Sequence, residues 1–212
     1  MGILSITHCT ASKTSNSDFN VSDLSPNQNF KKVTLTWSNF LENAKSLYIA
    51  RDLYRGGGFK KLNKNILNEE FLIISAGLGL ISSDTKIPSY ECTVSRSKAN
   101  SISDYFKDEF SYHMWWKYLI SSKYSLGQIN KISKNSKLVL ISVTSDYLKM
   151  IAEDLKLLKT NFLIFTGSKD LAISLGFEKN LTPYTEVFDG PDGTLRGTNR
   201  DFAQRTHTDF LH

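Results

Sequence analysis

The sequence predicts an α/β fold: a single three-layer α/β/α domain over residues 1–212 with a mainly parallel central sheet. Short apolar runs typical of buried strands alternate with segments of helical periodicity, and this alternation is typical of a parallel sheet covered on both faces. A length of 212 residues favours one compact domain over two small ones. A hydrophobic content of 40% with 22% charged residues is enough for a sizeable core.

The N-terminal part of the chain predicts one strand and one helix. Residues 3–6 are apolar and predict the first strand, and the Ser-, Asn- and Asp-rich residues 15–30 predict an irregular excursion. Ser38 is a candidate N-cap for a helix over 39–52, because apolar residues then recur at helical spacing. The three glycines at 56–58 would end that helix.

A short helix, a strand and a longer helix are expected next. Residues 59–67 predict the short helix, and residues 71–75 are apolar enough to form a second strand that is buried on both faces. Ser103 and Asp104 precede an aromatic-rich segment that predicts a helix over 105–121.

The final third of the chain repeats the alternation. Its expected elements are a strand over 137–143, a helix over 145–159, a strand over 161–165, a short helix over 169–175 and a last helix that begins at Asn199 or Asp201. The four named strands are therefore expected in one sheet of about four or five strands.

Charge and composition restrict the kinds of partner and compartment. The net charge of +5 and the pI near 9.1 favour an anionic partner. Cys9 and Cys92 are too few for a disulfide scaffold or a cysteine-based zinc site. The histidines lack a metal-ligand spacing, so we predict no metal, and we expect no other cofactor. No apolar run is long enough for a signal peptide or a membrane span, which predicts a cytoplasmic protein without a membrane partner.

Small residues follow the second strand at once. Ser75, Gly77 and Gly79 would let a ligand approach the backbone closely. Ligands of open α/β sheets bind outside the carboxyl ends of the strands, where this segment would lie. These residues are therefore substrate-binding candidates. The alternative is a strand followed by a turn and a surface loop, and these residues alone favour neither.

Three segments carry a resemblance to a known group of proteins. They are SITHCTASKT after the first strand, then ARDLYRGGGF, then SAGLGLI followed by PSYE. In this order they resemble DUF6884-type domains and the related module of archaeosine synthases, which are similar to members of the uracil-DNA glycosylase superfamily. Some phage-defence DNA glycosylases that remove bulky modified bases belong to that superfamily. The resemblance covers the first half of the chain well and the second half mainly through strand order.

Two positions depart from the family pattern. Glu91 stands where the family usually shows Asp, and FTGSKD at 165–170 stands where a uracil glycosylase has H-P-S-P. The resemblance therefore implies a uracil-DNA glycosylase-like fold more directly than it implies uracil specificity.

The resemblance implies a DNA glycosylase that excises a bulky modified base and leaves an abasic site, in defence against phages. The implied partner is DNA, including modified phage DNA. Two alternatives stay open. One is a non-catalytic nucleic-acid-binding module or sensor, and the other is an RNA base-modification enzyme that resembles archaeosine synthase.

Cleavage of an N-glycosidic bond requires a carboxylate and a pocket that holds a flipped-out base. Asp84 and Glu91 are the candidate catalytic carboxylates, and Tyr90 is the candidate ring for stacking on the base. Each also has an ordinary explanation: Asp84 as a turn cap, Glu91 as a solvated side chain and Tyr90 as a core residue. Their clustering in one segment favours the functional interpretation of the set.

Two further strand ends carry polar residues. After the third strand, Asp146 could accept a hydrogen bond from a base and Tyr147 could stack on it, although Asp146 also suits the start of a helix. After the first strand, Cys9 beside His8 suggests a nucleophile. Neighbouring residues rarely face each other, so we expect Cys9 to be a buried small side chain.

Basic and amide side chains in three loops are candidates for contacts with DNA phosphates. They are Lys13, Arg55, Lys60, Arg196, Asn199, Arg200 and Arg205. The alternative is a solvated basic surface whose arginines pair with nearby aspartates.

Overall fold

The computed structural model describes residues 2–66, 70–96, 98–184 and 197–212, and it has an α/β fold. A five-stranded sheet lies at its centre in the order β5-β4-β1-β8-β9, with β5 antiparallel to β4 and every other pair parallel. The strands are β1 (Ile3–His8), β4 (Glu70–Ser75), β5 (Gly79–Ser82), β8 (Leu138–Ser142) and β9 (Phe162–Phe165). The four strands expected from the apolar runs are thus confirmed.

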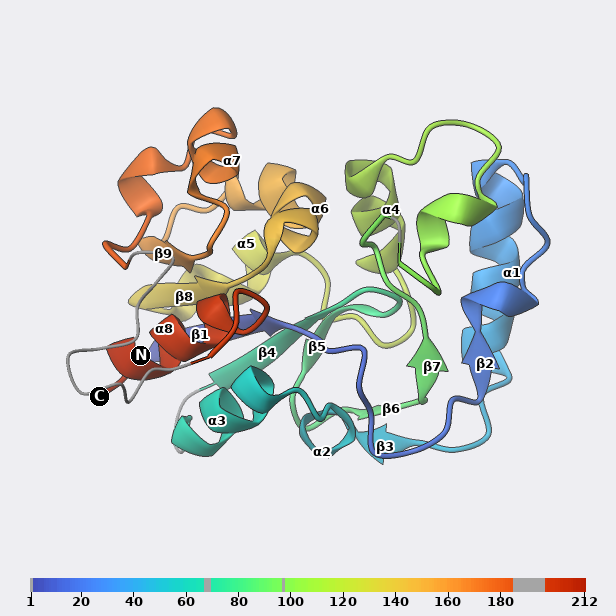
Figure 1. Cartoon of the computed structure of the whole chain (residues 1–212), viewed down its shortest axis with the longest axis horizontal. Helices are drawn as coiled ribbons and strands as arrows, with labels where there is room; N and C mark the ends of the chain where they lie inside the picture. Colours follow the sequence, from blue (N-terminus) through green and yellow to red (C-terminus); the bar gives the residue numbers. More distant parts are fainter. Residues whose placement is uncertain (1, 67–69, 97, 185–196) are drawn as a thin grey trace.

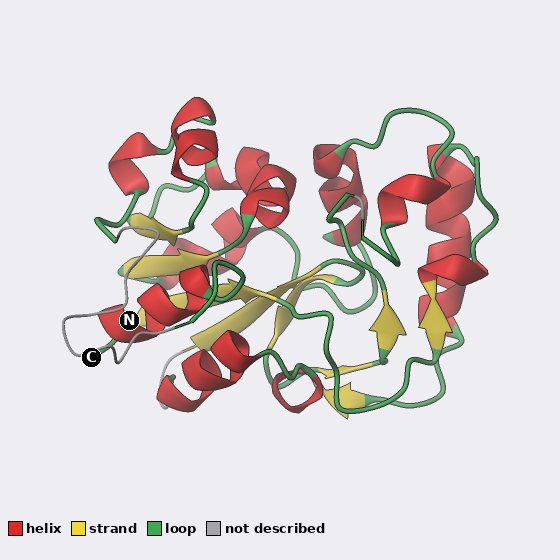
Figure 2. Ribbon diagram, in the orientation of Figure 1, coloured by secondary structure: helices red, strands yellow, loops and turns green. Residues whose placement is uncertain are grey.

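Helices cover both faces of this sheet, as Figure 2 shows. On one side, α3 (Gly57–Asn65) contacts α8 (Phe202–Phe210), and α8 lies against β8 and β9. On the other side, α6 (Ser145–Leu155) contacts α4 (Tyr112–Leu119) and α5 (Ile129–Ile132). This arrangement is compatible with the expected three layers.

The chain leaves β1 and β8 in opposite directions, although the two strands are neighbours. After β1 it reaches β4 on one side, and after β8 it reaches β9 on the other. Such a reversal is a topological switch point, and the crevice at its carboxyl edge is the usual ligand site of an open α/β sheet. In Figure 1 the carboxyl ends of β1 and β8 point toward the middle of the view, where α3, α6 and α8 begin.

The remaining elements are short strands, helices and turns in the segments that connect the sheet strands. They are β2 (Phe19–Asn20) parallel to β7 (Tyr90–Glu91), β3 (Tyr48–Ile49) antiparallel to β6 (Lys86–Ile87), α1 (Phe30–Glu42), α2 (Ala50–Leu53), α7 (Lys169–Ser174) and 3-10 turns at Val21–Asp23, Ile102–Tyr105, Ser133–Asn135 and Glu178–Asn180.

The helix predicted over 39–52 was wrong. The helix α1 begins nine residues earlier, because Asn29 is its N-cap and accepts a hydrogen bond from the Lys32 amide at 2.9 Å. Val33, Trp37 and Leu41 then place a buried stripe at a spacing of four residues. Of the later apolar residues, Ala44 and Leu47 lie in a loop, and those from position 48 on belong to β3 and α2.

Two other helices begin at other positions than predicted. The short helix α3 starts at Gly57, with Gly56 as its N-cap, so the glycines open this helix and do not end the one before it. In the aromatic segment the helix α4 starts only at Tyr112, after Ser111 accepts a hydrogen bond from the Met114 amide at 3.3 Å. The expected helices after β8 and β9, and the last helix with Asp201 at its N-cap, are confirmed.

The segment after β4 is a hairpin turn, not an open loop. Gly79 has φ +84° and begins β5, which runs back along β4. A Cβ atom at Gly79 would also lie 2.7 Å from the Leu119 carbonyl oxygen, so glycine is needed here both for its backbone conformation and for space. The turn therefore leads the chain back into the sheet.

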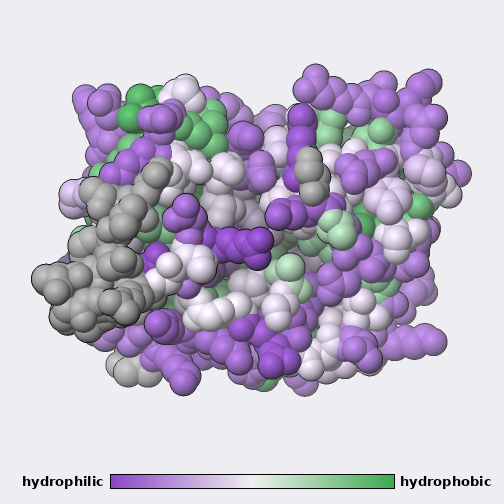
Figure 3. Space-filling model, viewed as in Figure 1, coloured by the Kyte–Doolittle hydropathy of each residue, from purple (hydrophilic) through white to green (hydrophobic). Residues whose placement is uncertain are grey.

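No helix in the described part of the chain is long and apolar enough to cross a membrane. Hydrophilic side chains cover most of the face drawn in Figure 3, with less polar ones among them near its middle.

Candidate functional site

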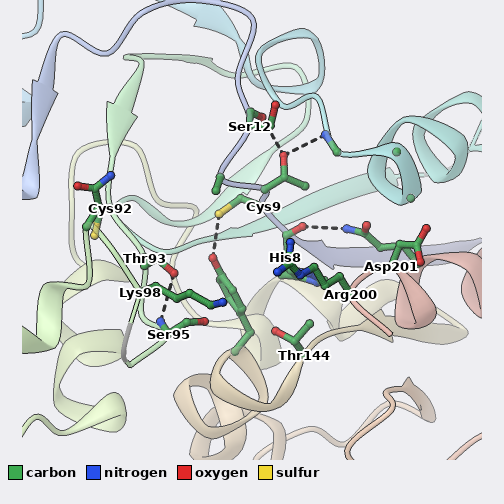
Figure 4. Close-up of a pocket in the computed structure, with 18 of the residues that line it drawn as sticks. His8, Cys9, Ser12, Cys92, Thr93, Ser95, Lys98, Thr144, Arg200 and Asp201 are labelled. Carbon is green, nitrogen blue, oxygen red and sulfur yellow. Dashed lines mark hydrogen bonds between the residues drawn. The ribbon is translucent and has the colours of Figure 1, made fainter. Parts of the chain in front are cut away.

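A pocket of about 650 Å³ opens at the carboxyl ends of β1 and β8, at the topological switch point. Its volume falls within the range of small-molecule sites. Residues from five parts of the chain line it, as Figure 4 shows: those after β1, at the start of α3, after β7, and at the starts of α6 and α8. Segments that are far apart in the sequence thus meet at one site.

Three helices begin at the wall of this pocket. Their N-cap residues, Gly56, Thr144 and Asp201, all line it. Gly56 has no side chain, and neither Thr144 nor Asp201 caps its helix with a side-chain hydrogen bond. The first amides of an α-helix have no partner within the helix, and the helix dipole adds partial positive charge there. The pocket wall is therefore suited to an anionic group.

Both carboxylates of the pocket are paired with basic side chains, and two other basic side chains of the pocket have no such partner among the described residues. Of its two carboxylates, Glu91 pairs with Lys13 and Asp201 pairs with Arg205. Lys98 and Arg200 also line the pocket, are exposed and have no ion-pair partner among the described residues. Figure 4 shows the Lys98 side chain extending into the pocket.

Glu91 is held at the pocket by a buried lysine. The Lys13 side chain is only 3% exposed, and its Nζ lies 3.7 Å from Glu91 Oε1. The same Nζ lies 4.8 Å from the centre of the Tyr90 ring and donates a hydrogen bond to the Ala11 carbonyl oxygen at 3.4 Å. Lys13 is thus buried beneath the site and has little surface to offer a phosphate.

A buried hydrogen-bond network that includes Tyr90 lies against the Lys13–Glu91 ion pair. The Tyr90 hydroxyl is hydrogen bonded to Ser75 Oγ and lies 3.2 Å from the Tyr54 hydroxyl. Burial raises the pKa of both phenols above the ordinary value, so they stay neutral. Tyr90 packs its ring on Phe19 and Trp37, so it is a core residue and offers no surface for stacking on a base.

The three segments that carry the resemblance therefore meet in one network. Lys13 comes from the first, Tyr54 from the second, and Ser75, Tyr90 and Glu91 come from the third. Of these five residues only Glu91 lines the pocket. The other four support it.

Other predicted residues lie away from the pocket. Asp84 is in the turn after β5, where its side chain is 71% exposed and pairs with Arg51. Gly77 is packed in the core, and its carbonyl oxygen accepts a hydrogen bond from Trp37 Nε1 at 2.8 Å. Gly79 forms the hairpin turn.

Tyr147 lies in the pocket, as predicted from its place after β8, but Asp146 does not. Tyr147 Oη lies 3.2 Å from Cys9 Sγ, and its ring centroid lies 5.0 Å from that of His8. Asp146 accepts a hydrogen bond from the Tyr112 hydroxyl at 2.8 Å and pairs with Lys149. The first turn of α6 thus directs one of the two side chains to the pocket and the other to α4.

The remaining basic candidates are dispersed. Arg55 and Lys60 are exposed but do not line the pocket, and Arg196 lies outside the described residues. Asn199 lines an adjoining hollow of about 360 Å³, and Arg200 lines both this hollow and the pocket. Arg205 is 4% exposed and pairs with Asp201.

Cys9 is buried, as expected, although it does reach the pocket wall. Many other pocket residues were not predicted as site residues, among them His8, Lys98, Thr144 and Gln204. His8 and Thr144 lie at the ends of two predicted strands, so knowledge of which strands are neighbours would have found them. Nothing local in the sequence indicates Lys98 or Gln204.

A buried polar cluster lies between α8 and the central sheet. The ring of His207 stacks on Phe165 with centroids 4.9 Å apart, and its two nitrogens lie 3.2 Å from Ser5 Oγ and 3.1 Å from Ser142 Oγ. Burial lowers the pKa of His207 to about 3, so the ring is neutral near pH 7. Among the described residues no group of three or more His, Cys, Asp and Glu side chains could hold a metal ion.

No protein-family model, curated protein or solved structure matches the chain.

Proposed function

We propose that the pocket takes up one nucleotide of a DNA strand and that the chain is a DNA glycosylase with Glu91 as its catalytic carboxylate. The observation that carries this proposal is the place of Glu91: a carboxylate held by a buried lysine in the wall of a 650 Å³ pocket that three helix N-termini border. The resemblance of the three sequence segments supports the same activity, and it adds a uracil-DNA glycosylase-like fold and a role in phage defence to the proposal.

The reaction needs a carboxylate near the sugar and a water molecule. The C1′–N bond breaks, the water oxygen bonds to C1′, and one water proton ends on the departing base. Glu91 would stabilise the positive charge that develops on the sugar or orient the water. Its ion pair with Lys13 keeps the carboxylate in one position.

The phosphates would lie against the helix N-termini and the two free cations. Lys98 and Arg200 line the pocket and are exposed, so they are accessible to a strand. Such contacts position the backbone and carry no sequence information. The volume, which suits a drug-sized ligand, favours a base larger than an unmodified one.

The glycosylase proposal predicts a large loss of activity for Glu91→Gln. Purified protein is incubated with normal DNA, uracil-containing DNA and DNA that carries glucosylated hydroxymethylcytosine, and abasic sites are then counted. We expect abasic sites on a modified DNA with the wild type, and a reduction of about 100-fold or more in Glu91→Gln, because a positioned carboxylate contributes at least this much.

Asp84→Asn is the matched control, because Asp84 is an exposed carboxylate in the turn after β5, outside the pocket. It should retain wild-type activity. Equal activity of the wild type and Glu91→Gln, or loss of activity in Asp84→Asn alone, would exclude Glu91 as the catalytic group.

The pairing of Glu91 with Lys13 also favours a second candidate, a non-catalytic nucleic-acid-binding module, because an ion-paired carboxylate is already neutralised. This candidate predicts salt-dependent DNA binding with no abasic sites on any of the three DNAs.

A further inference from the structure

One ring nitrogen of His8 faces the pocket as a hydrogen-bond acceptor. His8 is only 7% exposed, and its Nδ1 lies 3.2 Å from the Ser142 carbonyl oxygen. A carbonyl oxygen only accepts hydrogen bonds, so Nδ1 carries the proton. Burial lowers the pKa of His8 to about 4, so the ring is neutral near pH 7 and Nε2 keeps its lone pair.

The Nε2 atom has no hydrogen-bond partner in the part of the chain that the structure describes, and it is not a buried unpaired atom. Since His8 lines the pocket, Nε2 is accessible from the pocket space. An acceptor in this position requires a donor on the ligand or a water molecule.

Both the ring and the backbone of His8 are held in place. The ring of Tyr147 packs on it at 42° with centroids 5.0 Å apart. Gln204 Nε2 donates hydrogen bonds to the His8 carbonyl oxygen at 3.2 Å and to Thr7 Oγ1 at 3.1 Å. A rotation of the ring by 180° would break the bond to Ser142, so the acceptor stays on the pocket side.

We propose that His8 Nε2 accepts a hydrogen bond from the exocyclic amino group of the bound base, so that the pocket selects cytosine- and adenine-type bases over their keto counterparts. This inference rests on the proposed function, because it takes a nucleobase as the ligand. Cytosine keeps its exocyclic amino group when it is modified at C5, so a bulky modified cytosine fits both the donor requirement and the volume of the pocket.

A keto oxygen in the same place would face the lone pair of Nε2. The acceptor on the protein and the acceptor on the base would then both lose their water without gaining a bond. Leaving a buried polar group unpaired typically lowers affinity by about tenfold to a hundredfold.

Single-stranded oligonucleotides that differ at one central base test this selection without any need for cleavage. The pairs are cytosine against uracil and adenine against hypoxanthine, and binding is measured by fluorescence anisotropy. We expect the wild type to bind the amino member of each pair about tenfold more tightly or better. In His8→Gln the preference should vanish, because an amide offers both a donor and an acceptor.

His113→Gln is the control, because His113 is exposed on α4 and does not line the pocket, and it should keep the preference. Equal affinity of the wild type for both members of each pair overturns the inference, whether or not His8→Gln folds. So does a preference that persists in folded His8→Gln.

The two proposals fail in different ways. A preference for amino bases that depends on His8, without abasic sites on any DNA, supports the recognition by His8 and removes the glycosylase. Abasic sites that form without discrimination between amino and keto bases support the glycosylase and overturn the recognition.

Discussion

Replacement of Arg205 by methionine is expected to lower the free energy of unfolding by roughly 2 to 4 kcal/mol, because it leaves a partly buried carboxylate without its partner. The Arg205 side chain is buried, and its Nε donates a hydrogen bond to Asp201 Oδ1 at 3.2 Å. Its Nη2 donates to the Thr198 carbonyl oxygen at 3.4 Å. Methionine fills similar space but pairs neither oxygen. Urea unfolding measures the loss.

Arg200→Ala is the matched variant, because Arg200 is exposed at the pocket only five residues earlier. It should change stability by less than about 0.5 kcal/mol, as is usual for an exposed side chain. It should weaken DNA binding for all sequences and reduce the salt slope by about one. A stable Arg205→Met together with an unstable Arg200→Ala would contradict these assignments.

Acid is expected to destabilise the protein already between pH 6.5 and 5. The pKa of His8 falls from 6.5 to about 4 and that of His207 to about 3, in both cases through burial. A depressed histidine pKa means that the unfolded chain binds the proton first. The stability is therefore fully present above pH 6.5 and is lost as the pH falls toward the folded-state values. Each proton contributes about 1.4 kcal/mol per pH unit.

Urea unfolding at pH 7, 6 and 5 measures this slope. Near pH 5.5 the wild type should take up about two protons on unfolding, one for each buried ring. His207→Gln should take up about one fewer, and its remaining slope belongs to His8. A slope in His207→Gln as steep as that of the wild type would show that His207 is not buried as a neutral ring.

The strands could be predicted because a short apolar run is by itself typical of a buried strand, so the prediction does not depend on residues elsewhere in the chain. The helix α1 could not, because its start depends on Asn29, one of several asparagines and serines between residues 15 and 30 that could each cap a helix. The buried stripe of Val33, Trp37 and Leu41 was present in the sequence, but the choice of Ser38 as the cap divided it.

The place of the site depended on strand order, which the sequence does not contain. The small residues after β4 suggested that the ligand lies there, but Gly79 turns the chain back into β5. The pocket lies instead at the ends of β1 and β8. These two strands pair in the sheet although they are far apart in the sequence, so their pairing is known only from the tertiary structure. Glu91 and Tyr147 were nevertheless among the predicted residues: Tyr147 closely follows β8, and Glu91 follows Tyr90 in the polar segment after β4.

The burial of Lys13 and Tyr90 is a second feature that the local sequence could not predict. A lysine in a loop and a tyrosine beside an acid both have the composition of a binding surface. Only the packing in the structure shows that Lys13 is buried against the Tyr90 ring and forms an ion pair with Glu91.

Gly57 offers the most direct test of whether the pocket at the β1 and β8 ends receives the phosphates of a nucleic acid. Gly57 is the first residue of α3, lines the pocket and is exposed, and a Cβ atom there would meet nothing within 4 Å. Glutamate at this position suits the helix dipole, so the fold should tolerate it. The neutral Gly57→Gln has the same size and isolates the effect of the charge.

The decisive measurement is the affinity of both variants for DNA, with urea unfolding as the check on folding. Gly57→Glu should bind DNA about tenfold more weakly than Gly57→Gln, since like charges a few ångströms apart at a protein surface repel by roughly 1 to 4 kcal/mol. The difference should shrink as salt is added. Equal DNA affinity of the two variants at low salt would contradict a nucleic-acid site at this pocket.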